Sequence, residues 1–227
     1  MHIEPGIVTG AKLVLSYATS AVAAGYAIKL AAETVREQGI ISLAVRSAAA
    51  TVLVFSFFEL LPHFRVEISE VHFILGSTLF LLFGAAPAAF GLALGLLLQG
   101  LFFVPTDLPQ FGMNVTTLLV PLFAIRMLAG RIIPGNTTYV DLQYRQALAL
   151  STAYQSGIVG WVAFWALYGA GFGAENLIAI ASFAASYVLV IVIEPLADLA
   201  VLALAKILRG ATADGVVTHR LHNAAST

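Results

Sequence analysis

The apolar residues of this chain fall into long runs of about 18 or more residues with few charges. A helix needs about 20 such residues to cross a hydrocarbon layer about 30 Å thick. Hydrophobic residues make up 60% of the sequence and charged residues only 10%, whereas soluble domains are roughly half apolar and a quarter charged. The sequence therefore predicts an all-α fold, a polytopic membrane helix bundle.

Polar residues and breaks rich in proline and glycine divide these runs into about seven predicted transmembrane helices. The third and fourth are short, and the sequence Gly84-Ala-Ala-Pro87 separates them. We favour a helical hairpin here, with a single re-entrant unit as the alternative. The predicted spans are 12–32, 41–61, 72–83, 88–104, 115–133, 147–168 and 177–207.

The basic residues predict which ends of the spans face the cytoplasm, because short cytoplasmic loops collect lysine and arginine. The connections on the other side carry mainly acidic residues, such as Glu4, Asp107 and Glu175. We therefore expect the N-terminus outside and the C-terminus inside, in a multi-pass protein of the bacterial cytoplasmic (inner) membrane. Residues 1–209 form the predicted transmembrane permease domain, and 210–227 a cytoplasmic polar tail. The basic residues that set this orientation are Lys29, Arg36, Arg46, Arg126, Arg131, Arg145, Lys206, Arg209 and Arg220.

Composition also excludes several functions. The chain has no cysteine, so a metal ion must be bound through nitrogen or oxygen. Its net charge is -1 and its 11 basic residues are scattered, which argues against binding nucleic acid. No Walker-type phosphate-binding sequence is present, so any ATP must be handled by separate subunits. The first residues lack the basic region of a signal peptide, and we expect Met1 to remain as the first residue.

Three of the five histidines are predicted to lie at the outer end of the bundle. His2 is at the N-terminus, His63 follows the second span and His72 opens the third. The other two, His219 and His222, fall in the polar tail and are expected to be solvated.

The pair Met1-His2 has the atoms of a chelating site. A terminal amine, the deprotonated amide nitrogen of His2 and its imidazole Nδ1 close two fused chelate rings around one cation. A fourth nitrogen from His72 or His63 completes a square plane, a geometry that favours Ni(II) or Cu(II), with low-spin Co(II) also possible.

Two polar residues are candidates for supporting such a site. Asn114 follows an outer loop, where it either fixes the tautomer of a ligating imidazole or caps a helix. Gln99 lies inside an apolar run and is expected to face the bundle interior, where an interhelical hydrogen bond is the favoured role.

Five stretches resemble a known family, the CbiM/NikM-type substrate-binding components of cobalt and nickel energy-coupling factor (ECF) transporters. The resemblance covers roughly the first 120 residues. The matching stretches are Met1-His2-Ile3 with Glu4-Pro5-Gly6, Ser69-Glu-Val-His72-Phe-Ile-Leu-Gly76, Phe83-Gly84 with Pro87, Leu96-Leu-Leu-Gln99 with Leu101-Phe102, and Gly112-Met-Asn114.

The resemblance implies a transporter subunit rather than an enzyme, with Co2+ or Ni2+ as its substrate and no cofactor. It places the metal ion on Met1, His2 and His72, with Asn114, Gln99 and Ser69 as supporting residues. It also implies a transmembrane coupling subunit and two cytoplasmic ATPase subunits as partners. His63 has no counterpart in the family and is expected to be a helix-end histidine. The chain departs from the family pattern at Pro5, at Glu70-Val71 and in the loop 104–109, and these departures bear most on which metal is bound.

Other functions remain open from the residues alone. Glu59 and His63, four residues apart, are compatible with one helix face of an intramembrane hydrolase. Glu194 and Asp198 are compatible with a proton-coupled or stand-alone permease, or with pairing to Arg126 or Lys206. A membrane scaffold without transport is the remaining alternative.

Small residues also recur at helical spacing on two spans. They allow either close approach of a coupling subunit or packing within the bundle, and we favour packing. The two rows are Ala23, Ala27 and Ala31, and Gly91 and Gly95.

Overall fold

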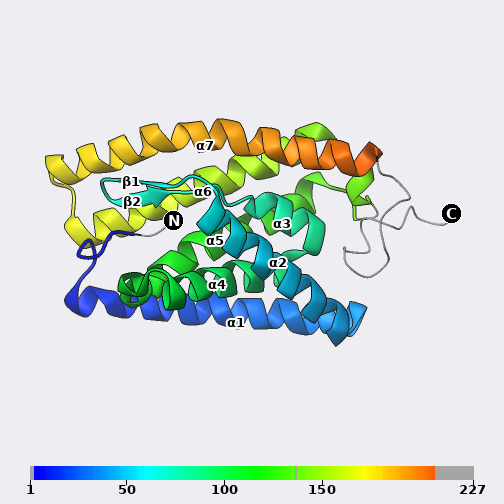
Figure 1. Cartoon of the computed structure of the whole chain (residues 1–227), viewed down its shortest axis with the longest axis horizontal. Helices are drawn as coiled ribbons and strands as arrows, with labels where there is room; N and C mark the ends of the chain where they lie inside the picture. The colour runs from blue at the N-terminus through cyan, green and yellow to red at the C-terminus, as the bar shows by residue number, and fades with distance from the viewer. Residues whose placement is uncertain (1–2, 136, 208–227) are drawn as a thin grey trace.

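The computed structural model of the chain describes residues 3–135 and 137–207. Within these ranges it contains seven α-helices, a short antiparallel β-hairpin and three 3-10 turns (Figure 1). The helices are α1 (Leu13–Gln38), α2 (Ile40–Leu60), α3 (Gly76–Phe83), α4 (Ala85–Phe102), α5 (Phe111–Ile132), α6 (Tyr144–Ala170) and α7 (Ala174–Ile207); the strands are β1 (Phe64–Val66) and β2 (Ser69–Val71); the 3-10 turns are η1 (Gly10–Lys12), η2 (Pro105–Gln110) and η3 (Tyr139–Asp141).

Six of the helices are long and apolar enough to cross a membrane, and α3 is not. The sequence predicted a full third span over 72–83, but only Gly76–Phe83 is helical, a length of eight residues. The chain between β2 and α3 forms no helix or strand, and Leu75 has a left-handed φ of 52°. The prediction of a polytopic helix bundle is confirmed, whereas the first third of the predicted third helix, residues 72–75, is not helical.

The β-hairpin lies near one end of the bundle (Figure 1). This end, here called the hairpin end, holds β1, β2 and the beginnings of α1 and α7. There Lys12 Nζ donates a hydrogen bond of 2.8 Å to the carbonyl of Gly169. The end of α7 lies at the opposite end of the bundle, where Lys206 Nζ donates to the carbonyl of Leu142 at 2.7 Å.

The break between α3 and α4 is confined to one residue. Gly84 has a φ of 90°, which a residue with a side chain rarely adopts, and its N–H donates to the carbonyl of Phe80. The predicted break ran to Pro87, but Pro87 already belongs to the first turn of α4. The buried Arg46 of α2 donates to the carbonyl of Phe83 at 2.8 Å and so satisfies an acceptor at the end of α3.

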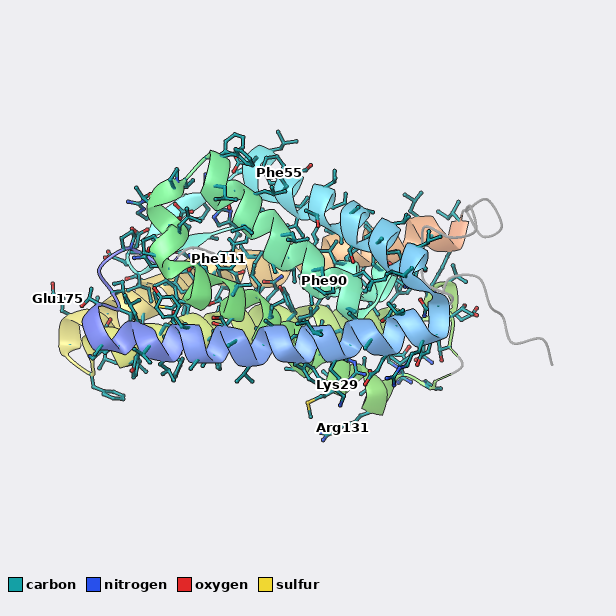
Figure 2. The ribbon with its side chains drawn as sticks, turned by 90° about the horizontal axis from the view of Figure 1, so that it is seen from below. Lys29, Phe55, Phe90, Phe111, Arg131 and Glu175 are labelled. Atoms are coloured by element: carbon teal, nitrogen blue, oxygen red, sulfur yellow. The ribbon has the colours of Figure 1, made fainter. Side chains whose placement is uncertain are left out.

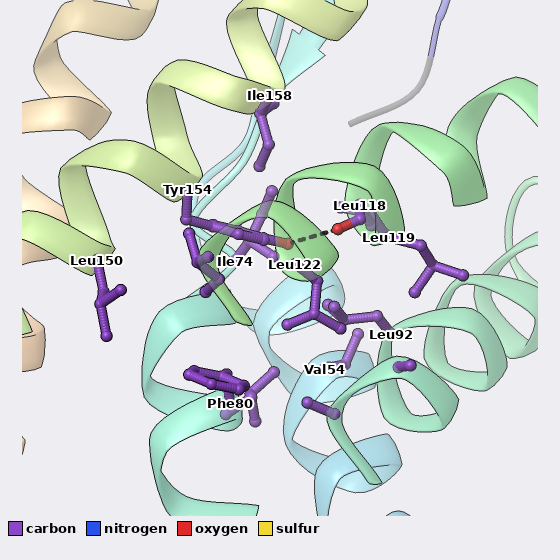
Figure 3. Packing of buried hydrophobic residues seen from close by; sticks show 14 of the residues in the cluster. Val54, Ile74, Phe80, Leu92, Leu118, Leu119, Leu122, Leu150, Tyr154 and Ile158 are labelled. Carbon is purple, nitrogen blue, oxygen red and sulfur yellow. Dashed lines mark hydrogen bonds between the residues drawn. The ribbon is translucent and has the colours of Figure 1, made fainter. Parts of the chain in front are cut away.

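A continuous apolar core joins the helices around the break (Figure 3). Tyr154 of α6 lies in its centre, fully buried, and its hydroxyl donates to the carbonyl of Leu118 at 3.4 Å. Gly76 begins α3 against the ring of Tyr154, and a Cβ there would lie only 2.2 Å from the nearest ring carbon. The short helix is therefore held inside the bundle, where a side chain at position 76 does not fit.

Both rows of small residues pack within the bundle, as favoured from the sequence. Ala23, Ala27 and Ala31 of α1 are buried among apolar side chains. Gly91 and Gly95 of α4 face α2, where added Cβ atoms would lie 2.4 Å from Ala50 Cβ and 2.6 Å from a methyl group of Val54. The two glycines allow α2 and α4 to approach closely.

We expect Gly91→Ala to destabilise the protein by about 1–3 kcal/mol, because the new methyl group overlaps the main chain of Ala50 as well as its side chain. The midpoint of thermal unfolding of the purified protein in detergent measures this. Gly160→Ala on α6 is the matched control, since no atom lies within 4 Å of its added Cβ. Equal midpoints for the two variants would show that α2 and α4 are not packed as described.

Candidate metal centre

The first described residues are anchored to the hairpin and to α5. Ile3 forms an isolated antiparallel bridge with Ser69 of β2, and its N–H donates to Asn114 Oδ1 at 2.8 Å. The N–H of Glu4 donates to the carbonyl of Ile68 at 3.1 Å. Ile3 itself is 1% exposed. The chain therefore enters the interior of the bundle at residue 3, while the predicted ligands Met1 and His2 lie outside the described residues.

Apolar contacts hold the same segment in place. Ile3 and Val8 form a buried cluster with Met113 of α5 and Trp165 of α6. Because these side chains come from three separate parts of the chain, the position of Ile3 depends on the folded bundle and not on local sequence.

His72 is buried directly after β2. Its side chain is 1% exposed, and its Nε2 lies 2.9 Å from Glu70 Oε2. Its ring and that of Phe58 of α2 pack edge to face, with ring centroids 5.4 Å apart. A hydrogen bond from Nε2–H to a carboxylate corresponds to the tautomer whose lone pair is on Nδ1, and metal-binding histidines commonly have such a carboxylate partner.

His63 stacks on His72, which the sequence did not predict. The two rings are nearly parallel, with an interplanar angle of 9° and centroids 4.9 Å apart, and His63 lies on the exposed side. The expectation that Glu59 and His63 share one helix face is wrong, because α2 ends at Leu60 and Leu61 is extended. The arrangement considered for a hydrolase is therefore not formed.

A chain of charges leads from the surface to His72. Arg65 Nε lies 2.6 Å from Glu4 Oε1, and Arg65 Nη2 lies 3.9 Å from Glu70 Oε1. Burial raises the pKa of the Glu4 carboxyl, and the negative charges of Glu70 and Asp107 act in the same direction, while Arg65 opposes them. The excess of carboxylates gives this end of the bundle a negative character that favours cations.

The predicted supporting residues are all buried at this end. Asn114, Gln99 and Ser69 are 1%, 2% and 0% exposed. Asn114 Oδ1 binds the main chain of Ile3, and Ser69 pairs with Ile3 through the bridge. In residues 3–135 and 137–207, no three side chains of histidine, aspartate or glutamate converge as a complete metal site.

The carboxylates of α7 lie elsewhere in the bundle, and their predicted basic partners are wrong. Arg126 binds the hydroxyl of Tyr26 at 3.1 Å and Glu33 at 3.5 Å, and Lys206 binds a main-chain carbonyl. Glu194 instead accepts hydrogen bonds from the main chain just after His72.

Nearly the whole chain is similar to one known family. The family described as the cobalt uptake substrate-specific transmembrane region, CbiM, matches residues 2–211. The chain belongs to this family. Membership extends the resemblance from the first 120 residues to nearly the whole chain and implies a multi-pass transmembrane component of cobalt uptake. No curated protein and no solved structure gives a significant match to the chain.

We expect Asn114→Ala to loosen the N-terminal segment, because the buried N–H of Ile3 loses its acceptor at a cost of about 1–3 kcal/mol. Faster hydrogen exchange at the amide of Ile3, measured by mass spectrometry, reports this. Asn176→Ala is the matched control: Asn176 binds the carbonyls of Ala166 and Gly171 and makes no described contact with Ile3. Unchanged exchange at Ile3 in Asn114→Ala contradicts the anchoring role.

Proposed function

We propose that the chain is the substrate-binding membrane subunit of an ECF-type importer for Co2+ or Ni2+. The ion is held by four nitrogens: the amine of Met1, the amide and imidazole nitrogens of His2, and the imidazole of His72. The observation that carries this proposal is the pairing of Ile3 with Ser69, three residues before the buried His72, in a member of the cobalt uptake family.

The reach of the chain supports this ligand set. A residue spans at most about 3.6 Å of extended chain, so His2 and the amine of Met1 stay close to the anchored Ile3. The side chain of Asn114 fixes that anchor, and β2 leads directly from Ser69 to His72. The two parts of the proposed site, Met1-His2 and His72, are therefore both connected to β2.

Glu70 supplies the tautomer that the site requires. With Nε2–H directed to Glu70, His72 presents Nδ1 to the ion, and the carboxylate makes the ring a more basic ligand. Glu70 is a departure from the family pattern in the sequence, and we assign it the role of orienting the imidazole of His72.

We further propose that the hairpin end faces outward and the opposite end faces the cytoplasm. Helix α3 is about 12 Å long, and with the non-helical residues 72–75 before it we count it as a seventh, partly helical crossing beside the six long helices. An odd number of crossings places the two termini on opposite sides. Figure 2 shows Glu175 at one end of the bundle and Arg131 toward the other, in accord with basic residues collecting on the cytoplasmic side.

Metal binding to the purified protein tests the ligand set. We expect near-stoichiometric Co2+ or Ni2+ by elemental analysis when Met1 is the first residue, and loss of that metal when extra residues precede Met1, because an amide nitrogen replaces the amine. His72→Ala should also abolish binding, whereas His63→Ala and His219→Ala should retain the metal.

The outcomes separate the possible errors in this proposal. Undiminished binding by the extended protein rules out the amine as a ligand. Loss of metal in His63→Ala but not in His72→Ala assigns the fourth nitrogen to His63. Absence of metal from the unaltered protein of metal-replete cells favours a scaffold without transport.

The energy source tests the proposed partners. The chain carries no Walker-type phosphate-binding sequence, and we expect uptake in proteoliposomes only when a coupling subunit and two ATPase subunits are present together with ATP. Uptake by the isolated chain that follows a proton gradient would identify a proton-coupled permease instead. Dissipating the gradient with an ionophore is the control.

A further inference from the structure

The break before α3 leaves main-chain N–H groups without helical partners in the interior of the bundle. Ile74 is fully buried, and residues 72–75 form neither helix nor strand. The first turn of any helix also lacks internal acceptors for its N–H groups. The interior of a membrane offers no water to these groups, so the protein itself must supply the acceptors.

Glu194 of α7 supplies them. One carboxylate oxygen accepts from the N–H of Ile74, and the other accepts from the N–H of Leu75 at 3.1 Å. Gln155 of α6 donates to the same carboxylate and accepts from the hydroxyl of Tyr187 at 2.9 Å. Glu194, Gln155 and Tyr187 are all 0% exposed. The carboxylate is thus fixed by α6 and α7 together.

Asp198, one helical turn along α7, holds the first turn of α3. It accepts from the hydroxyls of Ser77 and Thr78, and it is 2% exposed. The N-terminus of a helix carries a partial positive charge, which favours a nearby carboxylate. Since Arg126 and Lys206 bind other groups, the partners of these two carboxylates are the beginning of α3 and the polar side chains around it.

The main chain that Glu194 binds at Ile74 is only two residues from the proposed metal ligand His72. Glu70 holds the imidazole of His72 from the side of β2, and Glu194 holds the main chain at Ile74 from the other side. Helix α7 contributes no ligand to the proposed site, yet it fixes one of the two ends of the segment that carries His72.

We propose that Glu194 and Asp198 are positioning residues of the metal site: by binding Ile74, Leu75, Ser77 and Thr78 they fix the segment on which His72 is presented. This inference rests on the proposed role of His72 as a ligand. Under this proposal the two intramembrane carboxylates hold His72 in place and do not transport protons or bind a cation. Their oxygens already accept hydrogen bonds from the protein.

Glu194→Gln tests the proposal, because glutamine keeps the shape but directs an NH2 group at a donor. The full chain in lipid nanodiscs is loaded with Ni2+, and the rate of metal release to a chelator is measured. We expect release to accelerate about 10- to 100-fold, as when groups that orient a metal ligand are lost. The absorption band of bound Ni2+ should keep its position, because the four nitrogens are unchanged. Hydrogen exchange should accelerate at the amides of Ile74 and Leu75 and remain unchanged in α1 and α4.

Three further variants sharpen the test. Glu175→Gln, at the exposed beginning of α7, is the matched control and should release metal at the normal rate. Glu194→Gln combined with Gln155→Glu keeps one glutamate and one glutamine but moves the carboxylate to α6, so release should remain fast. Thr78→Val removes a single donor to Asp198 and should also accelerate release. It takes the place of Glu194→Gln if that variant does not fold.

The outcomes distinguish a failure of the positioning role from a failure of His72 as a ligand. Normal release in folded Glu194→Gln and Thr78→Val overturns the positioning role while leaving His72 as a ligand. Faster exchange throughout the bundle assigns Glu194 to general stability and also overturns it. Full metal retention in His72→Ala contradicts the proposed ligand set itself, whatever Glu194→Gln shows.

Discussion

Main-chain groups inside a membrane have no water to bind, and this constraint governs the centre of the structure. Wherever the chain leaves helical conformation, the bundle must provide the missing donors or acceptors. Glu194 does so just before α3 begins, and Arg46 does so where α3 ends, while Asp198 binds the hydroxyls of the first turn of α3. A helix of eight residues is maintained there because both of its ends are bound by side chains of the long helices.

The same break makes a metal site possible at this depth. An uninterrupted third helix would direct His72 according to helical geometry, whereas β2 and the non-helical residue after it let Glu70 and His72 meet as residues i and i+2. The hairpin also provides the edge with which Ile3 pairs. The metal site that we propose thus lies beside a small piece of β-structure on an otherwise helical bundle.

Much of this architecture was accessible from the sequence because it depends on local composition. The boundaries of the long helices agree with the apolar runs to within a few residues at most ends, with α1 continuing six residues beyond the predicted 32 to Gln38. The third span was harder to predict. Residues 72–83 are apolar enough for a helix, but whether they form one depends on partners about 120 positions away. The stacking of His63 on His72 and the true partners of Glu194 were inaccessible for the same reason.

By itself the sequence determined that the chain lies in a membrane, where its helices run, and that His72 and Asn114 belong to one end of the bundle. Apolar run length and loop charge settle these points, since both are properties of neighbouring residues. Only the tertiary structure decided that residues 72–75 are not helical before α3 begins, that Glu194 binds the main chain there, and that Asp198 binds the hydroxyls of Ser77 and Thr78. The physical reason is that buried polar groups must find partners in three dimensions, and contacts between α7 and the start of α3 leave no periodic trace in the sequence.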